Sequence, residues 1–192
     1  LSKMFKLGKQ NLDILQYWLK IGDDDQGQGY IETVNKYLEK DLNENDLDVL
    51  ITLIDLLYLA SWSFSGLKII EKIEDAFEKI FNPEHPKLLS LFVYKGNFLN
   101  LEADYENALE IFKNVLVKQE KTLGVSHPDT LLTANNLGLL YYKLEDYKKA
   151  ESFYKRSIEG NEVALGKNHP TTLTSIGNLA MVFNDIGEYD KA

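Results

Sequence analysis

The sequence predicts an all-α solenoid of antiparallel helix hairpins, and three observations carry this prediction. The dipeptide His-Pro begins at His85, His127 and His169, so two successive intervals are both 42 residues. Within each interval, apolar residues recur at steps of three and four, which is the spacing of one helix face. The same interval relates further identical residues in successive copies: Leu89, Leu131 and Leu173; Tyr105, Tyr147 and Tyr189; Ala108, Ala150 and Ala192. A fixed period of this length indicates one helical unit copied in series.

Residues 1–42 do not follow this register and predict an N-terminal helical hairpin that caps the solenoid. A helix at about 4–20 and a second one ending near Leu42 flank an acidic loop at 23–35. The loop resembles an EF-hand, but glutamines replace acidic ligands and Asn35 stands where calcium needs a bidentate glutamate. We therefore expect a solvated loop and no metal site, with calcium binding as the alternative.

Residues 43–84 predict a divergent copy of the repeated unit. Stepping back one period keeps the apolar positions, including Leu50, Leu53 and Ile70. The tyrosine position becomes Ser63, and no His-Pro pair is present. The copies that follow are predicted at 85–126 and 127–168, with a truncated one at 169–192.

The copy at 127–168 predicts two helices joined by a short turn at 144–146. Pro128 suits the first turn of a helix, where the missing N–H needs no partner. Gly166 is expected to end the second helix as a left-handed cap. The small residues Gly138 and Ala150 would let the two helices approach closely.

The recurring motif Asn-Leu-Gly/Ala, an aromatic residue three positions on, and then Tyr-x-x-Ala resembles the tetratricopeptide repeat. The 42-residue period with His-Pro and Leu-Gly is similar to the kinesin light chain variety of this repeat, which also occurs in bacterial proteins. The resemblance implies a right-handed superhelix whose first helices line a concave, peptide-binding face. It is specific for the fold and much less so for the function.

The resemblance also places a set of side chains on the concave face. Asparagine offers both a donor and an acceptor, so a row of asparagines would hold a peptide backbone without reading its sequence. The alternative is that Asn136 and Asn178 only tie neighbouring helices together. Ser90, Val93, Leu101, Thr174 and Asp185 map to the same face. The predicted peptide-binding residues are Asn97, Asn100, Leu132, Asn135, Asn136, Leu139, Tyr142, Lys143, Asn178, Met181 and Asn184.

Two binding modes known in the family match this sequence poorly. The clamp for a chaperone's carboxylate tail needs asparagines, which Asn97 and Asn136 would supply, and cations, whose places are taken by residues such as Val93 and Thr174. Kinesin light chains read acidic cargo motifs with basic residues, and Lys143 is the only basic residue among the predicted binding positions. We therefore expect a neutral to mildly basic protein segment as partner.

Composition excludes several other functions. The net charge is −9 and Arg156 is the only arginine, so the basic surface that nucleic-acid binding needs is missing. No apolar run approaches the roughly 18 residues of a membrane span. The absence of cysteine removes disulfides, thiolate nucleophiles and cysteine zinc sites, and it fits a cytoplasmic protein.

The three histidines look catalytic only if their period is ignored. Each precedes a helix-starting proline at the same place in its copy, so we expect loop or capping roles. They would also lie about one repeat apart, too far to share one zinc ion at about 2 Å each. We therefore predict no enzyme and no cofactor.

The leading functional hypothesis is a non-catalytic protein–protein interaction module that binds a peptide segment of a partner in its concave groove. One alternative is a regulatory or sensor region of a larger signalling protein. Another is a scaffold that self-associates. Because the sequence starts at Leu1 and stops partway through a copy, we also expect a fragment of a longer chain.

Overall fold

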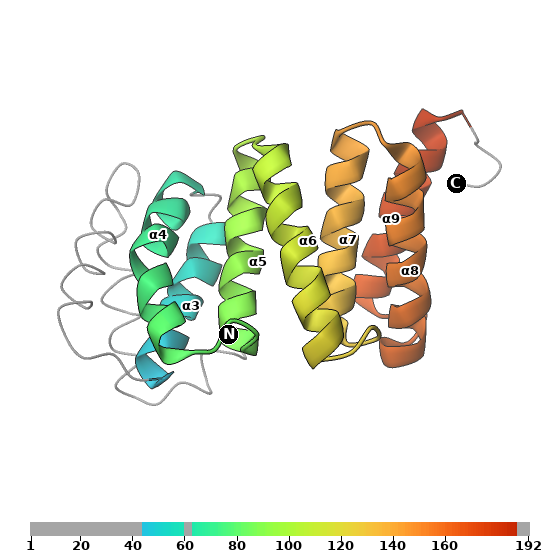
Figure 1. The fold of residues 1–192 in the computed structure, drawn as a ribbon. Coiled ribbons are helices and arrows are strands. Elements are labelled where there is room, and N and C mark those ends of the chain that lie inside the picture. The colour runs from blue at the N-terminus through green and yellow to red at the C-terminus, as the bar shows by residue number, and fades with distance from the viewer. Residues whose placement is uncertain (1–43, 60–62, 188–192) are drawn as a thin grey trace. The chain divides into compact units, whose positions relative to one another are not determined.

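The computed structural model of the chain describes residues 44–59 and 63–187 (Figure 1). These residues form helices joined by short turns, and they include no strand. The predicted all-α, tetratricopeptide-like fold is thereby confirmed. The predicted hairpin at 1–42 with its loop at 23–35, and the repeat residues Tyr189 and Ala192, lie outside the described residues.

The helix boundaries repeat at the period of the sequence. α3 and α4 begin and end exactly one 42-residue interval before α5 and α6, although their sequence lacks the His-Pro signal. α7 and α9 follow α5 at one and two further intervals. The helices are α3 (Glu44–Leu59), α4 (Ser63–Ile80), α5 (Pro86–Leu101), α6 (Tyr105–Thr122), α7 (Pro128–Lys143), α8 (Tyr147–Leu165) and α9 (Pro170–Asp185).

The His-Pro pairs start the first helix of each copy. His85, His127 and His169 are the N-cap residues of α5, α7 and α9, and each has an extended backbone. The Nδ1 atom of each imidazole accepts a hydrogen bond from the backbone N–H two residues on, at 3.2, 3.2 and 3.3 Å. This bond satisfies one of the free N–H groups of the first turn. The predicted capping role is confirmed.

The turns between paired helices share one strained backbone position. Ala103 and Glu145 both have φ of 60°, and the equivalent Gly187 has φ of 77°. The next residue caps the second helix: the carboxylates of Asp104 and Asp146 accept a hydrogen bond from the N–H three residues on. A left-handed residue followed by an acidic cap therefore reverses the chain between the helices.

Gly166 ends α8, but its conformation differs from the prediction. Its φ of 94° is positive, whereas its ψ of 160° lies far from the left-handed helical region. The chain leaves α8 in an extended direction, and the Gly166 carbonyl then accepts hydrogen bonds from the His169 N–H at 3.2 Å and the Thr172 hydroxyl at 2.9 Å. Glycine is needed here because a side chain disfavours this backbone geometry.

The chain forms two compact units, residues 1–102 and residues 103–192. The division falls between α5 and α6, the two helices of the predicted copy at 85–126. In unit 1, α3, α4 and α5 pack around an apolar core that includes Leu53, Ile70, Phe77 and Phe98. α4 and α5 approach closely at Gly66, where a Cβ atom would lie 2.3 Å from the Phe98 ring.

Unit 2 contains α6, α7, α8 and α9, with α7 packed against α6 and α8, and α8 packed against α9 (Figure 1). A Cβ atom on Gly138 would lie 2.8 Å from the Tyr154 ring, and Ala150 is completely buried. The predicted close approach of α7 and α8 at these small residues is confirmed. Burial of Tyr154 between the helices raises the pKa of its hydroxyl.

Buried polar side chains connect α7, α8 and α9. The Ser157 hydroxyl donates to the Leu131 carbonyl at 3.1 Å and lies 3.1 Å from the Ser175 hydroxyl. Ser175 in turn lies 3.0 Å from Oδ1 of Asn135, to which it can donate. Because an unpaired polar atom is costly inside a protein, these contacts hold the three helices in one register.

Candidate peptide-binding surface

α7 and α9 are the first helices of successive copies, and they lie side by side in unit 2. The Asn178 side chain donates from Nδ2 to Oδ1 of Asn135 at 3.3 Å, which links the two helices directly. We call the surface along these helices the α7–α9 face. Its members are Leu132, Asn135, Asn136, Leu139, Tyr142 and Lys143 of α7 and Asn178, Met181, Asn184 and Asp185 of α9.

Apolar and amide side chains alternate along the α7–α9 face. Leu132 is 42% exposed and Met181 is 46% exposed, so both offer apolar surface to a partner. Leu139 and Asn178 are half-buried, and Asn184 is exposed. Apolar groups beside hydrogen-bonding amides suit a guest that has both a backbone and side chains.

Asn135 occupies a different position from the other predicted binding residues. Asn135 is only 8% exposed. Its Oδ1 can accept hydrogen bonds from the Ser175 hydroxyl and from Nδ2 of Asn178. Two donors use both lone pairs of this oxygen, so its role is to hold α9 against α7. Asn178, which the interhelical alternative names together with Asn136, thus makes its interhelical contact with Asn135. Asn136 is half-buried and has an interaction partner of its own.

At the C-terminal end of the face, a hydrogen bond joins the two helices. The Tyr142 hydroxyl donates to Oδ2 of Asp185 at 2.6 Å, and this bond raises the pKa of the tyrosine hydroxyl. The Tyr142 ring centre lies 6.0 Å from that of Tyr147, at the start of α8. Lys143, beside this pair, is exposed.

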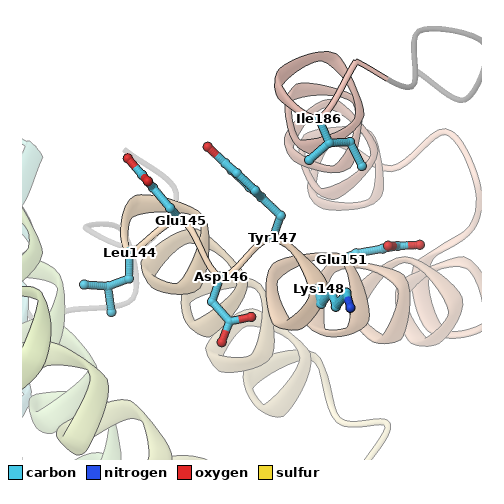
Figure 2. Close-up of a pocket in the computed structure, with 7 residues that line it drawn as sticks. All are labelled: Leu144, Glu145, Asp146, Tyr147, Lys148, Glu151 and Ile186. Atoms are coloured by element: carbon cyan, nitrogen blue, oxygen red, sulfur yellow. The ribbon is translucent and has the colours of Figure 1, made fainter.

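An open depression of about 590 Å³ lies beside this end of the face. Its lining comes from the turn between α7 and α8, the first turns of α8, and Ile186 after α9 (Figure 2). Figure 2 shows the carboxylates of Glu145, Asp146 and Glu151 pointing in different directions. The sequence did not reveal this depression, because it depends on where Ile186 lies beside the turn between α7 and α8. The lining residues are Leu144, Glu145, Asp146, Tyr147, Lys148, Glu151 and Ile186.

The predicted residues Asn97 and Asn100 belong to α5 in unit 1, whereas α7 and α9 belong to unit 2. Both are half-buried. Within the described residues, Oδ1 of Asn100 is buried without a hydrogen-bond partner, and Asn97 has an interaction partner. Assignment of these two side chains to peptide binding stays a prediction.

The described residues hold neither a cluster of metal ligands nor a helix that could span a membrane. Across residues 44–59 and 63–187, no group of three or more histidine, cysteine, aspartate or glutamate side chains is arranged to hold a metal ion. In the part of the chain that the structure describes, every helix is too short or too polar to cross a membrane.

Residues 87–162 match the family model of the tetratricopeptide repeat. No curated protein matches the chain. Among solved structures, the nearly identical TPR-like repeats of a putative kinesin light chain from Podosopora anserina share 20% identity, with a TM-score of 0.67 over 74% of this chain and 67% of that one. BtubC (BKLC) from P. vanneervenii shares 18% identity, with a TM-score of 0.71 over 86% of this chain and 66% of that one.

Two Rap proteins are also similar in structure. The apo form of RapI shares 16% identity, with a TM-score of 0.74 over 99% of this chain and 66% of that one. A Rap protein complexed with competence and sporulation factor shares 16% identity, with a TM-score of 0.70 over 100% of this chain and 51% of that one. The chain thus spans about two thirds of the length of RapI and half of the second Rap protein. At these identities the likeness concerns the fold.

Proposed function

We propose that this chain, whose residues 87–162 match the tetratricopeptide repeat, is a non-catalytic interaction module that binds an extended peptide segment of a partner protein. The α7–α9 face is the proposed binding surface. Repeats of this kind typically serve as protein-interaction modules, and the concave surfaces of solenoids commonly bind extended partners.

The observation that carries the proposal is the exposure of Leu132 and Met181 beside amide side chains on adjacent helices. An extended peptide presents an N–H and a carbonyl at every residue, so it needs donors and acceptors as well as apolar contacts. Because Asn178 uses Nδ2 for its bond to Asn135, its Oδ1 is the atom that would accept a peptide N–H.

Charge points to a neutral or mildly basic guest. The chain carries a net charge of −9, and Lys143 is the only cation on the α7–α9 face. A nucleic acid would meet net repulsion, because its binding depends on cations that neutralise phosphates. We place the interaction in the cytoplasm, where a chain without cysteine needs no disulfide for stability.

The proteins of similar structure support the proposal that a fold of this type binds a ligand. One of the similar Rap proteins was solved in complex with competence and sporulation factor, so a related helical array holds a ligand. The similar kinesin light chain and BtubC arrays share the same arrangement of helices.

The test is selection of a binding peptide from a random library, followed by affinity measurements on variants of the chain. Met181→Ala removes an exposed apolar contact, and Asn178→Ala removes the proposed acceptor. Each substitution is expected to lower the affinity for the selected peptide by about tenfold, which is the effect of one lost hydrogen bond or apolar contact. Calorimetric titration gives these affinities directly.

Ser152→Ala is the matched control, because Ser152 is exposed on α8 and lies outside the α7–α9 face. Its affinity should equal that of the unmodified chain. Thermal unfolding followed by circular dichroism checks that each variant remains folded. Unchanged affinity in both folded test variants would refute the proposed surface.

A further inference from the structure

We infer that the depression beside the α7–α9 face is a subsite for a lysine or arginine side chain of the guest. This inference rests on the proposed peptide-binding function and deepens it, because it names the chemistry of one guest residue. The depression is lined by one turn, the start of α8 and Ile186, so it is a defined place on unit 2 (Figure 2).

The depression is continuous with the proposed binding surface. Tyr142, a member of the face, lies 6.0 Å from the depression residue Tyr147 between ring centres. Asp185, which accepts the Tyr142 hydroxyl, directly precedes the depression residue Ile186. A peptide that follows the face toward the C-terminal ends of α7 and α9 therefore brings its next side chain to the depression.

The charges of the lining favour a cation. Glu145, Asp146 and Glu151 contribute three carboxylates, and Lys148 contributes one ammonium group. Asp146 is already paired with Lys149 at 2.6 Å. Oε1 of Glu151 is paired with Lys155 at 2.6 Å, which leaves Oε2 for a second donor. Glu145 is exposed, and no ion pair is recorded for it within the described residues.

The apolar part of the lining fits the carbon stem of a basic side chain. Leu144 and Ile186 border the depression together with the half-buried ring of Tyr147. Lysine and arginine pack their methylene groups on apolar surface while the charged head stays in water. An aromatic ring next to carboxylates attracts a cation by its electron-rich face as well as by charge.

Other occupants fit less well. A phosphate or carboxylate would meet the exposed carboxylate of Glu145, and Asp146 and Glu151 already hold the nearby lysines Lys149 and Lys155 in ion pairs. A metal ion needs several oxygen atoms converging at about 2.0–2.6 Å, and the carboxylates of the lining point apart (Figure 2).

The experiment uses two hexapeptides that differ in one atom group. The first is acetyl-Ala-Leu-Ala-Ala-Lys-Ala-amide, and the second has norleucine in place of lysine, which keeps the stem and removes the charge. Each is titrated into the isotope-labelled chain of residues 1–192, and the amide signals are followed by NMR. The lysine peptide should shift the signals of Tyr147, Glu151 and Ile186 and bind about three- to tenfold more tightly than the norleucine peptide.

The variant carrying both Glu145→Gln and Glu151→Gln should bind the two peptides equally. Glu159→Gln is the matched control, because Glu159 is an exposed carboxylate of α8 outside the lining, and it should keep the preference. A salt concentration of about 1 M should also weaken the preference, since the screening length for exposed charges then falls to about 3 Å.

The outcomes separate this inference from the proposed function. If the amide signals of the α7–α9 face shift but both peptides bind with equal affinity, the subsite is overturned and the proposed function stands. A lysine preference that persists in the double variant would overturn it as well. Failure of both peptides to shift the α7–α9 face counts against the proposed function, and failure of the lysine peptide to shift the depression counts against the subsite.

Discussion

At the scale of single residues, the histidines show how a repeat changes the meaning of a side chain. In isolation, three histidines suggest metal binding or proton transfer. Here each imidazole accepts a backbone hydrogen bond through Nδ1 at the start of a helix. The period, together with the proline that follows each histidine, was sufficient to predict a loop or capping role.

Replacement of His127 by alanine should destabilise the chain by about 1 kcal/mol, because one N–H of the first turn of α7 loses its partner. His127→Asn restores a short side-chain acceptor at the same position and should recover most of the loss. Urea unfolding followed by circular dichroism measures both changes. Equal stability of the alanine and asparagine variants would contradict the capping role.

The positive φ angles show a limit of prediction at this scale. Only Gly187 signals the left-handed position of the turn, because Ala103 and Glu145 adopt φ of 60° without a residue that favours it. Neither residue type prefers this region, so the sequence gives no local signal. For Gly166 the sequence indicated a helix end correctly, but the backbone angles depend on the contacts with His169 and Thr172.

At the scale of helices, close packing depends on which residue faces a glycine. Gly138 of α7 faces the Tyr154 ring, whereas a Cβ atom on Gly177 of α9 would meet nothing within 4 Å. The two glycines occupy the same kind of element, the first helix of a copy. They therefore form a natural pair for comparing a packing requirement with helix propensity.

Gly138→Ala should destabilise the chain by about 1–3 kcal/mol, because the added methyl group would overlap the Tyr154 ring in a well-packed interface. Gly177→Ala should instead stabilise α9 by up to about 1 kcal/mol, since alanine is the better helix former. Denaturant midpoints of the two variants provide the measurement. Similar shifts of the two midpoints in one direction would contradict this account.

The helices and the candidate site were predictable to different degrees. The boundaries of the helices follow from the period, because apolar positions and caps repeat with it. The positions of the α7–α9 face follow from the family resemblance. The burial of Asn135 does not, since it depends on Ser175 and Asn178 of another helix. The depression was equally hidden, because it joins a turn to Ile186.

At the scale of the whole molecule, each unit contains a tyrosine whose hydroxyl is kept neutral. In unit 1, burial raises the pKa of Tyr94, and its 2.7 Å hydrogen bond to Asp55 adds to the shift. In unit 2, burial raises the pKa of Tyr154. Because the unfolded chain releases these protons more readily than the folded chain, alkali favours unfolding.

We expect the free energy of unfolding to fall as the pH rises above about 10, the ordinary pKa of tyrosine. The fall continues toward the raised pKa values of the folded state, so below about pH 10 these two groups contribute their full stability. Urea unfolding at a series of alkaline pH values measures the free energy of unfolding as a function of pH. Tyr154→Phe keeps the ring and removes the proton, so its stability should fall less steeply; an identical slope would contradict this explanation.

The first helices α3, α5, α7 and α9 begin at intervals of 42 residues, so the chain can be divided into equivalent segments. A segment that runs from one His-Pro pair to the residue before the next carries a complete helix pair together with its own caps. Duplication or removal of such a segment changes the length of the array, and each new junction again joins the end of a second helix to the start of a first helix. Growth by unequal recombination would therefore cost this architecture little, and binding surfaces would lengthen in steps of one cassette.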